Sequence, residues 1–181
     1  MKILTYRMKK AFISFFLVAV IILLLTSCGE VPEKEGFTVS NLVDFKLSNY
    51  KATEYEFNNV SDFLDNDSLE GNMISIVYSG INGSYAKIVS AHTTKSKGVY
   101  YLWRAFAKEN NALFKSSFTA IPFLMGEYKT DKDSLYVESW FKEKWFFYLE
   151  SDNSEELERI RIQLNDFFEN PDVINESVIE L

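Results

Sequence analysis

The dipeptide Asn82-Gly83 lies between two runs of residues that favour β-strands, and this arrangement constrains the fold more than any other feature of the chain. The runs are 73–79 (MISIVYS) and 85–91 (YAKIVSA). Asn and Gly tolerate the positive φ angles that tight turns require, so this pair between two such runs predicts a β-hairpin. The chain is therefore expected to fold around antiparallel strands.

A second hairpin is predicted further along the chain. Residues 135–141 (LYVESWF) and 145–150 (WFFYLE) are rich in β-branched and aromatic residues, and they flank the charged segment 142–144. Residues 51–57 alternate in a way that is typical of a strand with one solvated face. Together these runs predict an antiparallel sheet of about five to six strands built from hairpins.

Residues 154–170 (SEELERIRIQLNDFFEN) show the clearest helical pattern. Ser154 is the expected N-cap, and Pro171 ends the helix. Because the polar face is rich in acids rather than bases, we expect the helix to pack on the sheet and not on a membrane. The expected fold class is α+β, with this C-terminal amphipathic helix packed on one face of the sheet. Its apolar stripe consists of Leu157, Ile160, Leu164, Phe167 and Phe168.

Two segments stay open. Residues 99–110 (VYYLWRAFAKEN) fit a helix by the spacing of their apolar residues and a strand by their β-branched and aromatic start, and helix is favoured. Residues 111–126 contain an apolar group around Pro122, which breaks any helix there. This group must be buried in the domain, covered by a partner or inserted at a membrane face, and burial is the default expectation.

The first 27 residues differ from the rest of the chain. Residues 1–10 carry four basic residues and no acid, and residues 11–25 contain a single polar residue, Ser14. This apolar run is short of the roughly 20 residues that a membrane-spanning helix needs. It is typical of the apolar region of a signal peptide that follows a basic segment. We therefore expect the remainder of the chain to be exported.

Cys28, the single cysteine, comes directly after this region. The sequence Leu25-Thr26-Ser27-Cys28 resembles the lipobox of bacterial lipoproteins, in which an aliphatic residue and two small residues precede a cysteine. The resemblance implies that diacylglycerol is attached to the Cys28 thiol, and that cleavage before Cys28 makes it the mature N-terminus. Lipidation would also account for a cysteine that has no disulfide partner in an exported chain. The alternative is an uncleaved N-terminal membrane anchor.

The expected organisation is a signal peptide at 1–27, a flexible tether at 28–36, a single globular domain at 37–170 and a C-terminal tail at 171–181. The lipid on Cys28 would hold the protein in the cell envelope. It would place the domain on the outer face of the cytoplasmic membrane or in the outer membrane.

The chain is acidic, with a formal charge of −7. Loss of residues 1–27 removes four basic residues and no acid, which takes the formal charge from −7 to −11. A strongly acidic surface lacks the cations that phosphate contacts require, so nucleic acid is not an expected partner.

Few residues suggest catalytic or metal chemistry. Residues 58–71 are acidic, but counting an EF-hand loop from Asp65 places Leu69 and Glu70 at positions five and six, and the pattern fails. His92 is the only histidine, and the sequence offers it no cysteine partner and no serine in a nucleophile motif. It is therefore interpreted as a polar residue at a strand end. Phosphate loops, zinc spacings and nucleophile elbows are absent from the sequence. The sequence assigns no catalytic, cofactor-binding or metal-binding residue, and Cys28 is its one assigned site.

These observations favour a non-catalytic binding or envelope-assembly module, with an envelope protein or glycan as its partner. Exposed aromatic side chains are the expected contact residues. The candidates are Tyr100, Tyr101, Trp103, Trp140 and Trp145.

Whether the protein is an enzyme stays open. The alternative function is a carboxylate-dependent hydrolase that acts on envelope or extracellular glycans, with two acids on either side of a cleft. Its possible members are Asp62, Asp65, Glu138 and Glu143. A structural envelope protein that works by occupancy is a third possibility.

Overall fold

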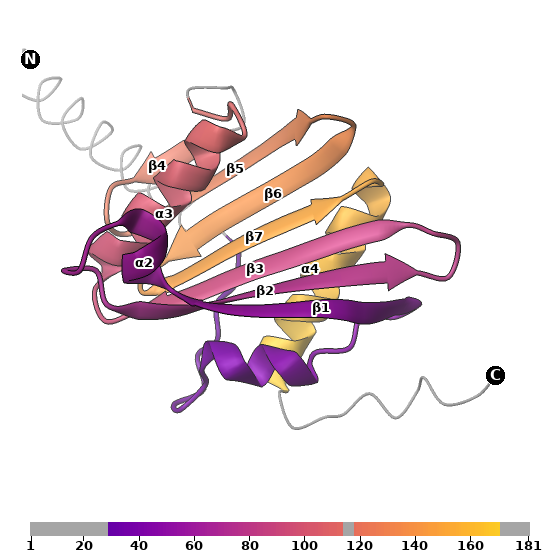
Figure 1. The fold of residues 1–181 in the computed structure, drawn as a ribbon, viewed down its shortest axis with the longest axis horizontal. Coiled ribbons are helices and arrows are strands. Elements are labelled where there is room, and N and C mark those ends of the chain that lie inside the picture. The colour runs from indigo at the N-terminus through magenta and orange to yellow at the C-terminus, as the bar shows by residue number, and fades with distance from the viewer. Residues whose placement is uncertain (1–28, 114–117, 171–181) are drawn as a thin grey trace, which may run out of the picture.

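The computed structural model describes residues 29–113 and 118–170, which form a seven-stranded sheet with helices on both faces (Figure 1). The elements in chain order are the 3-10 helix η1 (Val39–Asp44), β1 (Tyr50–Asn59), α2 (Val60–Leu64), β2 (Gly71–Gly80), β3 (Tyr85–Thr93), α3 (Ser96–Glu109), β4 (Thr119–Ile121), β5 (Met125–Lys132), β6 (Leu135–Lys142), β7 (Trp145–Ser151) and α4 (Ser154–Glu169).

The strands lie in the order β1-β2-β3-β7-β6-β5-β4, and all neighbouring strands are antiparallel. The chain passes from β3 through α3 to the far edge of the sheet. It then returns through β4, β5 and β6, and β7 closes the sheet against β3 (Figure 1). The two edges are therefore β1, which is long, and β4, which has three residues.

The expected α+β class, antiparallel sheet and packed C-terminal helix are confirmed, whereas the expected count of five to six strands is wrong, because there are seven. The sequence did not indicate β4 and β5. The first is very short, and the second (MGEYKTDK) lacks a regular apolar alternation. Pairing with β6 along its whole length, rather than local strand preference, accounts for β5.

The hairpin predicted at Asn82-Gly83 joins β2 to β3. Its loop consists of residues 81–84, and the Gly80 N–H donates a 2.8 Å hydrogen bond to the Ser84 carbonyl across the turn. Gly83 has a φ of +77°, as expected where a turn ends in a left-handed residue. Residues 99–110 lie largely within α3, so the favoured helical interpretation is confirmed.

Both faces of the sheet carry a packed core. Figure 1 shows α2 and α3 in front of the sheet and α4 behind it. The core on the α4 and η1 face includes Leu42, Ile74, Ile76, Trp140, Phe147, Ile160 and Leu164. The core on the α2 and α3 face includes Val60, Leu102, Trp103, Tyr128, Phe141 and Phe146.

The first described residues lie on the sheet. Gly29, Val31 and Pro32 are buried, and the Trp140 indole N–H donates a 2.8 Å hydrogen bond to the Glu30 carbonyl. A Cβ on Gly29 would lie 2.5 Å from the indole ring, so the backbone rests directly on that ring. Part of the segment expected to be a tether therefore packs on the fold, and residues 33–36 after it are exposed.

Asn153, and not Ser154 as expected, caps α4. Its side-chain oxygen accepts hydrogen bonds from the backbone N–H groups of Glu155 and Glu156, at 2.9 and 3.4 Å.

We expect Asn153→Ala to lower the free energy of unfolding by about 1 kcal/mol, because these donors lose their acceptor. Urea unfolding followed by tryptophan fluorescence measures this. Asn153→Asp keeps the acceptor and is the control; an equal loss in both variants would contradict the capping role.

Candidate functional site

The three tryptophans among the five proposed contact residues belong to the core. Trp103 and Trp140 are fully buried, and Trp145 is nearly so. The proposal that they are exposed is wrong, because helices cover both faces of the sheet and not one. The other two candidates, Tyr100 and Tyr101, lie on α3 and reach the surface.

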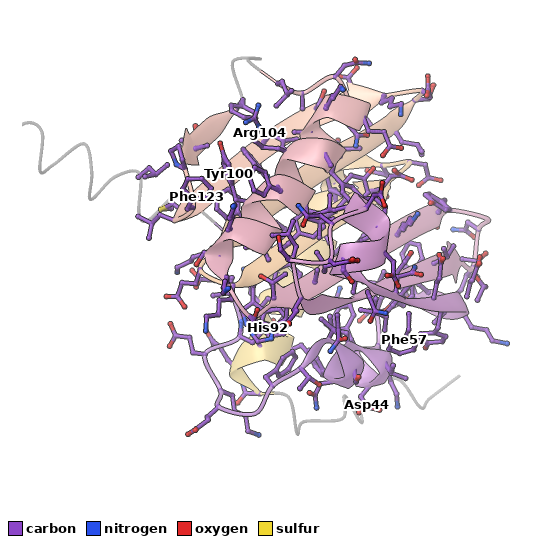
Figure 2. All side chains as sticks on the ribbon, turned by 60° about the vertical axis from the view of Figure 1, so that its left-hand side comes forward. Asp44, Phe57, His92, Tyr100, Arg104 and Phe123 are labelled. Carbon is purple, nitrogen blue, oxygen red and sulfur yellow. The ribbon has the colours of Figure 1, made fainter. Side chains whose placement is uncertain are left out.

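Tyr100 and Tyr101 join Phe123 and Leu124 in what we call the surface aromatic cluster. The Phe123 ring centroid lies 4.6 Å from that of Tyr100 and 6.3 Å from that of Tyr101, both edge to face. Figure 2 shows Tyr100 and Phe123 next to each other, with Arg104 further along α3. Residues from a helix and from a turn between strands thus meet at one surface.

The β4–β5 turn holds Phe123 and Leu124 at this surface. Pro122 occupies the first central position, and the Leu124 N–H donates to the Ile121 carbonyl across the turn at 3.1 Å. Phe123 follows Pro122 with a φ of +64°, where turns of this kind ordinarily carry glycine. A left-handed φ costs a residue with a side chain roughly 1–2 kcal/mol. The turn therefore presents this ring at an energetic cost.

Phe123 and Leu124 are 48% and 47% exposed. Burial was expected for the apolar group within residues 111–126, and it is wrong for these two side chains, although Met125 beside them is buried. For these two side chains, contact with a partner or with a membrane face stays a prediction of the sequence. Pro122 was the available signal in the sequence, because proline favours the first central position of a turn and connecting segments run over the protein surface.

Cations border the surface aromatic cluster. The Lys97 ammonium lies 5.6 Å from the Tyr101 ring centroid, and the Arg104 guanidinium lies 5.8 Å from that of Tyr100, within the range of cation–π attraction. A groove of about 400 Å³ between the α2 region and α3 begins at Tyr101. Its lining has two cations and no acid, and consists of Leu64, Asn66, Leu69, Tyr101, Arg104, Ala105, Lys108 and Leu113.

The cluster lies at the end of the sheet where β3 leads into α3 and where the β4–β5 and β6–β7 turns meet; we call this the aromatic end. The Glu143 N–H donates to the Leu124 carbonyl at 3.0 Å, and the Thr93 N–H donates to the Lys144 carbonyl at 3.0 Å. These bonds join the three loops into one surface.

Charged side chains of both signs lie at the two ends of the sheet. The loops and strand ends of the aromatic end, including residues 60–70 between β1 and β2, carry Lys95, Lys97, Lys142 and Lys144 against Asp62, Asp65, Asp67, Glu70 and Glu143. The turns of the opposite end carry Asp131, Asp133 and Asp152 against Lys132. Neither end is therefore net basic.

His92 lies within β3 and pairs with Trp145 of β7. Its ring stacks on the indole, with centroids 4.4 Å apart. Burial, together with the charge of Lys144, lowers the pKa of His92. These contacts agree with the interpretation of His92 as a residue near a strand end.

The structure does not bring the four proposed hydrolase acids together. Asp62 in α2 and Asp65 at its C-cap are exposed, whereas Glu138 is buried on the opposite face of the sheet and Glu143 lies in the β6–β7 turn. Among residues 29–113 and 118–170, no three His, Cys, Asp or Glu side chains gather closely enough to hold a metal ion. Cys28 lies outside the described residues.

Glu138 belongs to a buried ion cluster under α4. Its carboxylate contacts Arg161 and lies 3.2 Å from the Lys129 ammonium. The Glu127 carboxylate lies 3.3 Å from the same guanidinium, which covers the Trp140 ring at 5.2 Å. Burial raises the pKa of Glu127, and the charges of Arg161 and Lys129 act in the opposite direction. We therefore assign Glu138 to the packing of α4.

Three hollows between described residues contain two or more acids, and none of these acids is among the four proposed. Asp44 and Asp166 line one hollow, and Glu30, Glu33 and Glu169 line another. Asp152 and Glu156 line the third, at the end of the sheet opposite the aromatic end. Asp152 accepts a 3.0 Å hydrogen bond from the Tyr85 N–H, and Glu156 pairs with Arg159 at 2.5 Å. Both carboxylates already have partners within the fold.

No family profile and no curated protein matches the sequence. Among solved structures, a GTP-binding regulator from Thermotoga maritima is similar, with 14% identity over 75% of this chain and 90% of its own, and a TM-score of 0.53. A protein from Mycobacterium smegmatis has 9% identity over 70% of this chain and 93% of its own, with a TM-score of 0.34. The first similarity concerns the fold alone.

Proposed function

We propose that the protein is a lipid-anchored, non-catalytic binding module of the cell envelope. The observation that carries this proposal is the order of residues 2–28: a basic start, an apolar run, and the lipobox-like sequence that ends at Cys28. Within the described residues, no helix is long and apolar enough to cross a membrane. The lipid on Cys28 is then the attachment to the outer face of the cytoplasmic membrane or to the outer membrane.

The surface aromatic cluster supports a binding role for the domain. Interface hot spots are rich in aromatic residues and arginine, and Tyr100, Tyr101 and Arg104 are placed together here. Phe123 has a strained, positive φ and an exposed ring. Backbone strain is concentrated at functional sites, so this conformation favours a contact surface. Binding is favoured over hydrolysis, because the four acids considered for hydrolysis share no hollow.

We expect Cys28→Ser to abolish lipidation. When the full chain is expressed in a bacterial host, intact-mass spectrometry should find the unaltered protein without residues 1–27 and with an added diacylglycerol mass. The variant should keep residues 1–27 and carry no acyl mass, because serine lacks the thiol that is alkylated.

Ser27→Ala is the matched control, since it keeps a small residue before Cys28 and should remain lipidated. An unaltered protein that retains Met1, or that carries a free Cys28 thiol, would overturn the proposed lipid anchor.

A further inference from the structure

We propose that the aromatic end of the sheet docks on the bilayer that holds the lipid, so that Phe123 and Leu124 enter its headgroup region. This inference rests on the proposed function, because it takes the lipid on Cys28 as given. The inference goes beyond the proposed function in two ways. It names the phospholipid surface as the partner of the surface aromatic cluster, and it gives the orientation of the domain on that surface.

The place where the chain joins the domain is the first support. Gly29 lies on the Trp140 ring, and the Cα of Cys28 is one peptide link, about 3.8 Å, from that of Gly29. Trp140 is two residues from the end of β6 at Lys142, or about 7 Å along the strand. The lipid therefore reaches the fold near the aromatic end, and no long linker separates the two.

The chemistry of the surface is the second support. Phe123 and Leu124 protrude from a turn, with Tyr100 and Tyr101 behind them. Aromatic rings with a polar tip are enriched where a membrane meets water, and apolar side chains on a loop gain by entering the acyl boundary. A firm lipid anchor holds the surface beside the bilayer, so even a weak contact is populated.

The test compares probes at the two ends of lipidated, full-length protein in vesicles of phosphatidylethanolamine and phosphatidylglycerol. Leu124→Cys places a probe at the aromatic end, and Ile81→Cys, whose native residue is 84% exposed, places one at the opposite end. Lipidation consumes the Cys28 thiol, so the introduced thiol is the one that reacts with an environment-sensitive fluorophore.

We expect nitroxide-labelled lipids to quench the probe at position 124 at least threefold more strongly than the probe at position 81. Equal quenching at both positions, as for a domain that tumbles freely, would overturn the docking.

Phe123→Gly, added to the Leu124→Cys protein, tests the ring itself. Glycine accepts the φ of +64°, so the fold should keep its melting temperature while the quenching at position 124 falls to the level at position 81. Asp133→Gly is the matched control, because it relieves a φ of +53° at the opposite end and should leave the quenching unchanged. Unchanged quenching in Phe123→Gly would contradict a docking role for this ring.

The acyl mass on Cys28, measured on the same sample, separates the two proposals. A protein without acyl mass refutes the lipid anchor. An acylated protein with equal quenching refutes the docking alone. A probe at position 124 that vesicles leave unquenched, but that native envelopes shield, would also refute bilayer docking and would point to a protein or glycan partner.

Discussion

Replacing Arg161 with methionine is expected to lower the free energy of unfolding by about 3–5 kcal/mol, which is the usual effect of removing one partner from a buried ion pair. Arg161 contacts the buried Glu138 carboxylate, and its guanidinium lies 3.3 Å from Glu127. Methionine fills much of the volume over Trp140 but leaves both carboxylates with Lys129 alone, which is itself largely exposed. Urea unfolding at pH 7, followed by tryptophan fluorescence, measures the loss.

The double variant Arg161→Met with Glu138→Gln is the control, because it leaves the most buried carboxyl group neutral. We expect it to recover most of the stability. A loss below about 1 kcal/mol in the single variant would contradict a buried cluster, since only solvent-exposed pairs contribute so little.

Lowering the pH should also restore the Arg161→Met variant. Below the ordinary glutamate pKa of 4.5, Glu127 is protonated in both the folded and the unfolded chain and has no effect on stability. Burial raises the folded pKa, so the folded chain binds more protons just above that value, and stability falls as the pH rises through this window. The Arg161→Met variant lacks the charge that opposes the rise in the Glu127 pKa. The pH range over which its stability falls should therefore extend to higher pH than in the unaltered protein.

Trp140→Ala is the second substitution with a large expected effect, about 3–5 kcal/mol of unfolding free energy. Trp140 is fully buried, stacks on Phe147 with centroids 5.1 Å apart, and lies beneath Arg161. The substitution would leave a cavity and would also remove the surface on which Gly29 rests. Chemical unfolding measures the first effect, and limited proteolysis of the N-terminal segment measures the second.

Trp140→Phe serves as the control, because it keeps an aromatic ring but loses the N–H that bonds to the Glu30 carbonyl. We expect a smaller loss of stability, with faster cleavage near residue 33 than in the unaltered protein. If Trp140→Ala left the proteolysis rate unchanged, residues 29–32 would not depend on this side chain for their place on the sheet.

The hairpins and α4 could be predicted from the sequence, because each rests on a local pattern. The Asn82-Gly83 loop and the apolar stripe of α4 are examples. By contrast, β5 has no such pattern, and it forms because β6 pairs with it throughout. The buried ion cluster was equally hidden, since Glu127, Glu138 and Arg161 come from three separate elements.

The surface aromatic cluster could be predicted only in part. Tyr100 and Tyr101 were candidates because they are aromatic, but the same criterion also selected Trp103, Trp140 and Trp145, which are core residues. Sequence patterns did not reveal that a second helix covers the other face of the sheet. Phe123 was assigned to the interior because its neighbours are apolar, and the 48% exposure of its side chain in the structure shows that the turn holds it outside.

Under the proposed lipid anchor, the burial of Gly29 and Val31 has a consequence for the cleavage before Cys28. A peptidase that cuts before Cys28 must bind the chain in an extended conformation on both sides of the scissile bond. Once Gly29 and Glu30, just after that bond, are packed against the Trp140 indole, they are no longer accessible for binding by the peptidase. Processing would then have to precede the last stage of folding, and a precursor that folds too early would escape the peptidase.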